Sequence, residues 1–200
     1  MNLNDYQTLL TTDISDALEP GCAMDVGIRS LWRPTPKIMG IAYTVKCENH
    51  SNTHLHDAIY SASKGAIIVC ESDANDYAVA GGNVCAVAQE NGIAGFIIDG
   101  CVRDIGEIRE RKIPVFARGI FPKPGSKKTD GSSKADITCG GLSISTGDLI
   151  AADEEGIVVV RKDQIEPSMQ LALQKKEKAE AQSLADWRSS HEKKIKSILS

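Results

Sequence analysis

The chain has 200 residues, 42% of them hydrophobic, and its 23 basic and 27 acidic side chains give a net charge of −4. This length and composition favour one globular domain with a substantial core, and the acidic balance argues against nucleic acid as a main partner. No apolar run is long enough to cross a bilayer and the N-terminal residues lack a signal-peptide pattern, so we expect a cytoplasmic protein without membrane contact.

Six cysteines lie far apart in the sequence, and none forms a CxxC pair. Buried free thiols in a reducing compartment are therefore favoured over disulfides. Four of the six fall within or beside predicted core elements: Cys47, Cys70, Cys85 and Cys101.

The first 72 residues predict alternating helices and strands. A helix is expected over 3–10 and a second helical segment over 13–18, for which Thr12 or Asp13 is the cap. A strand over 38–47 and a helix from about residue 52 or 53 to 64 follow. A buried strand over 66–72 leads into a polar loop at 72–76.

Three histidines, His50, His54 and His56, lie around the start of the helix expected near residue 53. Neutral imidazoles bind transition metals. His50 and His54 are four residues apart, but a helix that begins between them does not present them as a pair. A solvated helix start is the favoured interpretation.

Residues 80–107 predict a helix whose start must lie close to the end of the strand that follows it. The sequence favours a helix over 83–91, stopped by Gly92, and then a strand over 94–98. The helix carries the chain away by roughly 13 Å at about 1.5 Å per residue, and the strand brings it back. The helix start at 82–84 should therefore lie beside the strand's carboxyl end at 100–104.

The residues at this junction can bind an anion and a metal. A helix start offers unpaired backbone N–H groups, and the paired glycines Gly81 and Gly82 allow close approach to the backbone. Arg103 adds a planar fork of donors, and Asp104 adds a hard oxygen ligand for a divalent ion. The alternative is a plain surface ion pair worth under about 1 kcal/mol.

The rest of the chain predicts a helix over 105–112, strands over 113–117, 140–144, 149–152 and 156–160, and a helical tail from residue 163. This pattern indicates a mixed α/β domain over 1–162 and a C-terminal extension over 163–200 that packs on the domain or on a neighbouring subunit. Arg118 is either a second anion contact or a solvated residue. The four lysines of 121–136 indicate a phosphate or RNA contact or, more simply, a solvated loop.

The spacing of Gly82, Arg103-Asp104 and Glu107 resembles the signature of the divalent-metal-dependent 4-hydroxy-4-methyl-2-oxoglutarate / 4-carboxy-4-hydroxy-2-oxoadipate aldolases. These enzymes belong to the larger family of the regulator of ribonuclease activity A. The resemblance extends from about Thr12 to Val160. It includes the segments TTDISDAL near the start, GIAYTV at 40–45, PVFARGIFP at 114–122 and GDLIAADEEGIVVV at 147–160.

The resemblance implies a layered α-β-β-α sandwich of the swivelling phosphohistidine-domain type, assembled as a homotrimer or homohexamer with sites between subunits. It also implies retro-aldol cleavage of a 4-hydroxy-2-oxo acid to pyruvate and a second carbonyl product, and decarboxylation of oxaloacetate as a side activity.

Each motif residue has an expected role in this chemistry. Mg²⁺ or Mn²⁺ would be held by Asp104, and the substrate carboxylate by backbone N–H groups at Gly82, Asn83 and Val84. Arg103 would stabilise the enolate. Glu107 would orient Arg103 or a metal-bound water.

Three alternatives to the aldolase hypothesis arise from the same family. Related ribonuclease regulators act by binding an RNA-processing enzyme, but the regulator proper lacks an acid at the position of Asp104, and this favours the enzyme. Some members carry a menaquinone methyltransferase label, yet no glycine-rich loop that would hold S-adenosylmethionine follows a first strand. A sugar-acid enzyme using the same enolate chemistry is the third. Arg161, where relatives often have proline, and the Lys/Glu-rich tail depart from the family pattern.

Overall fold

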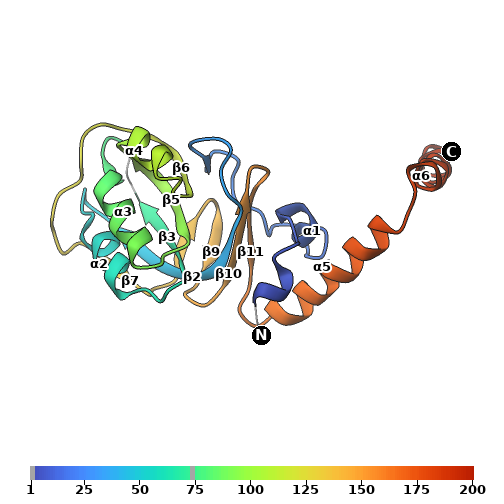
Figure 1. The fold of residues 1–200 in the computed structure, drawn as a ribbon, viewed down its shortest axis with the longest axis horizontal. Coiled ribbons are helices and arrows are strands. Elements are labelled where there is room, and N and C mark those ends of the chain that lie inside the picture. The colour runs from blue at the N-terminus through green and yellow to red at the C-terminus, as the bar shows by residue number, and fades with distance from the viewer. Residues whose placement is uncertain (1–2, 73–74) are drawn as a thin grey trace.

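A computed structural model describes residues 3–72 and 75–200 and shows one mixed α/β domain with a long C-terminal helical arm (Figure 1). The main sheet contains, in spatial order, β1 (Arg29–Ser30), β6 (Val115–Ile120), β5 (Gly95–Val102), β3 (Ile67–Ser72), β2 (Ile38–Cys47), β10 (Leu149–Asp153) and β11 (Gly156–Val160). Two short strands extend it, namely β4 (Ala78–Ala80) beside β5 and β7 (Gly131–Ser133) beside β2. A separate hairpin joins β8 (Ile137–Cys139) to β9 (Leu142–Ile144).

The centre of the sheet is parallel because helices connect its strands. Strands β2, β3, β5 and β6 pair in parallel, and each connection between them includes a helix. The connecting helices are α2 (Thr53–Ser61), α3 (Gly82–Glu90) and α4 (Ile105–Glu110). All three bury apolar side chains in one core cluster on the same face of the sheet, which explains the continuous apolar runs of β3 and β5.

The opposite face of the sheet covers a second core. The sheet curves around this core and is nearly closed as a barrel. Ile67, Ile97 and Phe116 pack there against side chains from the β8–β9 and β10–β11 hairpins. The segment before β1 spans the remaining gap, because the N–H of Met24 donates to the carbonyl of Ile157 in β11 at 3.0 Å, whereas β1 itself pairs with β6. The predicted mixed α/β single domain is confirmed.

Several element boundaries differ from the predictions. The strand Ile38–Cys47 has the predicted bounds. A helix was predicted for residues 3 to 10, and this prediction was wrong beyond the first turn. Only a short helix of the 3₁₀ type, η1 (Leu3–Tyr6), forms there. The next helix, α1 (Thr11–Ser15), begins two residues early because the carboxylate of Asp13 accepts the N–H of Leu10 at 2.9 Å. The polar loop predicted at 72–76 includes residues 73–74, which lie outside the described chain.

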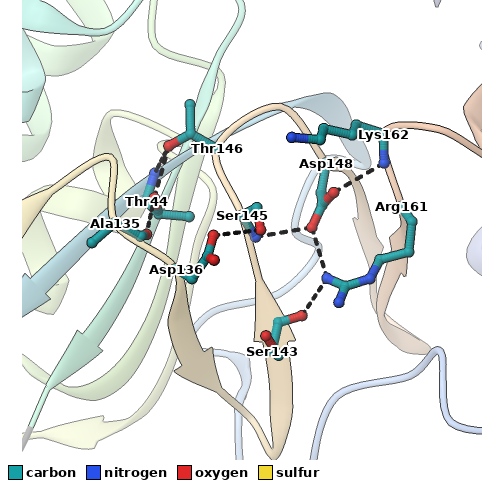
Figure 2. Close-up of polar contacts among 9 residues, drawn as sticks. All are labelled: Thr44, Ala135, Asp136, Ser143, Ser145, Thr146, Asp148, Arg161 and Lys162. Carbon is teal, nitrogen blue, oxygen red and sulfur yellow. Dashed lines mark hydrogen bonds and ion pairs between the residues drawn. The ribbon is translucent and has the colours of Figure 1, made fainter.

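Arg161, which departs from the family pattern, has a structural role (Figure 2). Its guanidinium donates to the carboxylate of Asp148 at 3.0 Å and to the carbonyl of Ser143 at 2.6 Å. Asp148 is 2% exposed and also accepts the N–H groups of Ser145 and Lys162 at 2.9 Å each. A buried carboxylate needs such partners, so this network fixes the β9–β10 turn against the end of β11.

The C-terminal arm divides into a packed helix and an unpacked one. α5 (Ile165–Glu180) buries Ile165, Met169 and Ala172 against η1 and α1. α6 (Leu184–Leu199) buries no residue and lies beyond the far end of α5, away from the sheet (Figure 1). None of the helices in the described chain is long and apolar enough to span a membrane.

All six cysteines are free thiols, as predicted. Burial raises the pKa of Cys85, in α3, to about 12, and the nearby carboxylate of Asp104 adds to this rise. Because only the thiolate is a nucleophile, Cys85 is an inert packing residue although its helix borders the candidate site.

Candidate active site

The start of α3 and the end of β5 meet as the sequence analysis predicted. The strand β4, which was not predicted, brings them together, because it pairs with β5 and leads directly into Gly81 and Gly82. The N–H of Arg103 donates to the carbonyl of Ala80 at 3.0 Å. The paired glycines and the Arg103-Asp104 dipeptide are therefore neighbours.

Both glycines are in close contact with charged side chains. A Cβ at Gly81 would lie 2.6 Å from Oδ2 of Asp104, and one at Gly82 would lie 2.0 Å from Oε2 of Glu107. The N–H of Gly82 donates to Oδ2 of Asp104 at 3.1 Å, and Nε of Arg103 lies 3.4 Å from the same oxygen. Asp104 has φ 59°, a left-handed conformation that aspartate tolerates better than most residues.

The helix start retains donors for an anion, although one of its amides has an acceptor within the protein. The N–H of Gly82 is directed to Asp104. The N–H groups of Asn83 and Val84 lie in the first turn of α3, where the helix supplies no acceptor. The N–H of Gly82 is thus already used within the protein. The N–H groups of Asn83 and Val84 are the ones that remain for the predicted substrate contact.

Glu107 lies against Gly82, and within the described chain it forms no ion pair with Arg103. Its carboxylate is therefore at the positive end of α3. This position is compatible with the predicted contact to a metal-bound water, and it gives no support to the predicted contact with Arg103.

A cavity of about 170 Å³ opens at this junction. One wall is formed by Gly81, Asn83, Val84, Arg103 and Asp104. Pockets for drug-sized ligands have volumes of roughly 300–1,000 Å³, so this cavity suits a small acid.

A second part of the cavity lining was missed by the sequence analysis. It is formed by α2 and by the loop after β6, with Asn52, His56, Pro124, Gly125 and Lys127. The N–H of Gly125 donates to the carbonyl of Ala78 at 2.9 Å, which holds the loop beside β4. The run of lysines and the three histidines near residue 53 were the sequence signals, and they did not show which side chains the fold would place at the cavity.

Lys127 is fixed in place by the residues of α2. Its Nζ donates to Oδ1 of Asn52 at 2.5 Å and lies 3.0 Å from Nδ1 of His56. Burial, together with the charge of Lys127, lowers the pKa of His56 to about 4, so this imidazole is neutral at pH 7. Burial also lowers the pKa of Lys127. The second wall thus presents one ammonium group to the cavity.

The three histidines considered as metal ligands do not converge. His50 lies 3.2 Å from the carboxylate of Asp76, and His54 contacts Ser133. His56 is the one that reaches the cavity. Over residues 3–72 and 75–200, no three His, Cys, Asp or Glu side chains are grouped so that they could hold a metal.

Arg118 is not an anion contact at the cavity. Its guanidinium forms ion pairs with Asp25 and Asp99. Asp99 in turn accepts the N–H of Gly140 at 2.7 Å. Arg118 therefore connects the segment before β1 to β5, and this interpretation as an anion contact is wrong.

Asp104 is the residue at the cavity that fits a hard divalent ion. Both of its contacts use Oδ2, and Oδ1 has no hydrogen-bond partner among the described residues. Mg²⁺ is commonly held by one or two carboxylates, with water and substrate oxygens completing its coordination. A single carboxylate at a water-accessible cavity is consistent with that chemistry.

We expect Gly82→Ala to destabilise the fold by less than about 1 kcal/mol, because the new methyl group would overlap the carboxylate of Glu107, whose exposed side chain can move aside. Urea unfolding measures the change. Gly106→Ala is the matched control, since no atom lies within 4 Å of a Cβ there and alanine favours the helix. If adding Glu107→Ala relieves none of the cost of Gly82→Ala, this contact is not its cause.

We expect acid to destabilise the wild-type protein partly through His56. Its pKa is about 4 in the folded protein, against 6.5 for an unperturbed histidine, so the unfolded chain takes up a proton that the folded chain does not. This contribution is complete above pH 6.5 and is lost as the pH falls toward 4. It should be about 1 kcal/mol, because solvent screens this partly exposed group.

Urea unfolding at pH 7.5 and pH 4.5 tests this expectation. His56→Gln should lose less stability between the two pH values than the wild type does. His191→Gln, in the exposed helix α6, controls for the loss of an imidazole. Equal losses for wild type and His56→Gln would contradict the expectation.

Comparisons with known proteins agree with this fold. A protein of Halalkalibacterium halodurans named "putative 4-hydroxy-4-methyl-2-oxoglutarate aldolase" is 35% identical over 92% of this chain and 87% of its own length. The solved structure of the RNA-processing inhibitor RraA from Thermus thermophilis is 26% identical, with a TM-score of 0.70 over 76% of this chain and 92% of that one.

A third relative has a different name. A Geobacillus kaustophilus structure described as an S-adenosylmethionine:2-dimethylmenaquinone methyltransferase is 27% identical, with a TM-score of 0.69 over 82% of this chain and 98% of that one. The family model for RraA-like proteins, described as aldolase/RraA, matches residues 11–159. The chain therefore belongs to the RraA-like family.

Proposed function

We propose that this protein is a divalent-metal-dependent aldolase that cleaves a 4-hydroxy-2-oxo acid to pyruvate and a second carbonyl product. The observation that carries the proposal is the convergence of the Asn83 and Val84 amides, Arg103 and Asp104 on one small cavity. The name of the Halalkalibacterium halodurans relative supports it.

The substrate carboxylate would bind at the start of α3. The N–H groups of Asn83 and Val84 have no acceptor in the helix, and the helix dipole favours an anion there. The absence of a Cβ at Gly81 lets Oδ2 of Asp104 and Cγ of Arg103 pack against the backbone there, which brings both side chains to the helix start.

Arg103 would contact the 2-keto oxygen. Its Nε lies 3.4 Å from Oδ2 of Asp104, and the residue lines the cavity. When the C3–C4 bond breaks, negative charge develops on the keto oxygen, and a positioned guanidinium stabilises that charge.

Lys127 would bind a second anionic group of the substrate. It lines the same cavity as Arg103 and is held by Asn52. A substrate with a carboxylate at each end would match the two walls of the cavity. Removal of the C4 hydroxyl proton would fall to a water or hydroxide, because His56, with a pKa of about 4, is a weak base at pH 7.

Mg²⁺ or Mn²⁺ would be held by Asp104, with Glu107 near enough to the start of α3 to orient a coordinated water. A bound divalent cation supplies Lewis-acid polarisation of the keto acid. The oxygen donors at the cavity are the kind that these cations prefer.

Pyruvate release from a panel of 4-hydroxy-2-oxo acids and oxaloacetate tests the proposal, first with magnesium or manganese and then with EDTA. We expect release with metal and its loss with EDTA. Oxaloacetate should also be decarboxylated, because that reaction passes through the same pyruvate enolate. No release from any substrate with either metal would refute the aldolase.

The alternative function is a protein-binding regulator of RNA processing. The similarity to the RNA-processing inhibitor from Thermus thermophilis is the observation that supports it. Tight binding to a ribonuclease, together with the absence of pyruvate release, would favour this alternative.

We also propose that the protein assembles as a homotrimer or homohexamer with sites between subunits. We propose further that its fold is the layered α-β-β-α sandwich of the swivelling phosphohistidine-domain type and that its location is cytoplasmic. The extension over 163–200 would pack on the domain or on a neighbouring subunit.

A further inference from the structure

The ammonium group of Lys127 uses two of its three N–H donors within the protein. One donates to Oδ1 of Asn52 at 2.5 Å, and Nζ lies 3.0 Å from Nδ1 of His56. An ammonium group has three donors and no acceptor. Residues 3–72 and 75–200 offer Nζ no third partner, so one N–H remains for a ligand in the cavity that Lys127 lines.

His56 holds Lys127 as a hydrogen-bond acceptor. Because an ammonium group only donates, the contact requires a ring nitrogen that carries no proton. Burial and the charge of Lys127 lower the pKa of His56 to about 4, so the ring is neutral at pH 7. The ring also forms a hydrogen bond with the backbone of Val79, in β4. The partner of one ring nitrogen decides which nitrogen carries the proton, so the contact with Val79 leaves the other nitrogen to accept from Lys127.

The start of α2 fixes both acceptors. Asn52 is 4% exposed, and its N–H donates to the carbonyl of Ser126 at 3.0 Å. The N–H of His56 donates to the carbonyl of Asn52 at 3.1 Å, and the two residues, four apart, lie on one face of the helix. They receive a lysine that comes 71 residues after His56 in the chain.

This arrangement removes the freedom of a flexible side chain before a ligand binds. A lysine has a long stem with many rotamers, and ordering it at the moment of binding weakens the affinity. Two fixed acceptors order the ammonium group in advance and leave its remaining N–H with one direction. The cost of ordering is then met in folding and does not fall on substrate binding.

We propose that Asn52 and His56 are positioning residues, which direct the remaining N–H of Lys127 to a carboxylate on C4 of the substrate. Both act through Lys127. The inference rests on the proposed aldolase activity and adds the residues that would make the contact with the second anionic group effective.

Two substrates separate this role from the bond-breaking step. 4-Hydroxy-2-oxoglutarate carries a carboxylate on C4, whereas 4-hydroxy-2-oxopentanoate carries a methyl group there. Pyruvate release is measured with magnesium for the wild type and for Lys127→Met, His56→Leu and Asn52→Ala. His54→Leu is the control, because it removes an imidazole from the same helix, where His54 contacts Ser133 and does not line the cavity.

Lys127→Met should raise the KM for 4-hydroxy-2-oxoglutarate by about 10–100-fold, because a charge-assisted hydrogen bond is lost, and should leave kcat within about twofold. His56→Leu and Asn52→Ala should raise this KM severalfold. None of the three should change kcat/KM for 4-hydroxy-2-oxopentanoate, which therefore reports that the site is still folded. His54→Leu should behave as the wild type.

Two further variants test whether His56 acts through Lys127. His56→Gln keeps an amide oxygen that can accept from Lys127, so its KM should stay near the wild-type value. His56→Leu combined with Lys127→Met should be no worse than Lys127→Met alone, because the two residues share one interaction.

Three results would overturn the inference and leave the aldolase intact. One is an equal loss on both substrates in His56→Leu, which would indicate general damage to the site. Another is full additivity in the double variant. The third is a wild type that cleaves both acids with equal efficiency, which would show that Lys127 binds no second carboxylate. A wild type that releases pyruvate from none of the acids tested would instead refute the aldolase and, with it, this inference.

Discussion

Asp104→Asn is expected to lower pyruvate release at saturating magnesium by more than about 10³-fold, because it removes the carboxylate that would hold the cation. Asparagine tolerates the left-handed backbone at this position, and its amide oxygen can still accept the N–H of Gly82. The fold should therefore persist. Asp104→Ala should be equally inactive and, in addition, less stable by about 1–2 kcal/mol from backbone strain.

Two measurements separate this effect from a general loss of structure. Calorimetric titration with Mn²⁺ should show that the wild type binds the ion and that Asp104→Asn does not. Glu110→Gln, an exposed acid on the same helix, is the control and should retain both binding and turnover. Wild-type turnover of Asp104→Asn in magnesium would show that the proposed mechanism is wrong.

The wall of the site that could be predicted from the sequence is formed by residues close in the chain. The helix from Gly82 and the strand ending at Val102 both have clear periodicity, and together they require that Asn83 and Arg103 lie near each other. What could not be predicted was the strand that joins them. Ala78–Ala80 is three residues long, too short for its pattern to separate a strand from a loop.

The second wall depends on contacts between distant segments. Lys127 lies at the cavity because the backbone around Pro124 and Gly125 pairs with Ala78, about 47 residues earlier in the chain. Local patterns carry no information about that pairing. The ion pairs of Arg118 could not be predicted for the same reason, because its partners Asp25 and Asp99 come from two other segments.

The fold shows the same division. The strand at Ile38–Cys47 could be predicted at its full length because it is a long run of strand-forming residues. The closure of the barrel could not, since it depends on the irregular segment through Met24, whose backbone pairs with β11. The tail was predicted to be helical from its composition, but composition does not reveal that only the first of its two helices packs on the domain.

Arg103→Ala is expected to lower kcat by about 10²–10³-fold, with a smaller change in KM, because its guanidinium would act on charge that develops during bond breaking. Arg103→Lys should recover only part of the loss, since an ammonium group does not reproduce the planar fork. Stability should change by less than about 1 kcal/mol, because the pair with Asp104 is long, at 3.4 Å, and solvent-exposed.

Arg118→Met provides the opposite case. Arg118 forms ion pairs with two acids away from the cavity, so its loss should lower the stability in urea and leave kcat near the wild-type value. Pyruvate-release kinetics and urea unfolding on both variants would separate the two roles. If Arg103→Ala retained full kcat and lost stability instead, the Arg103-Asp104 dipeptide would be a structural ion pair. The main reason for assigning catalysis to this cavity would then be gone.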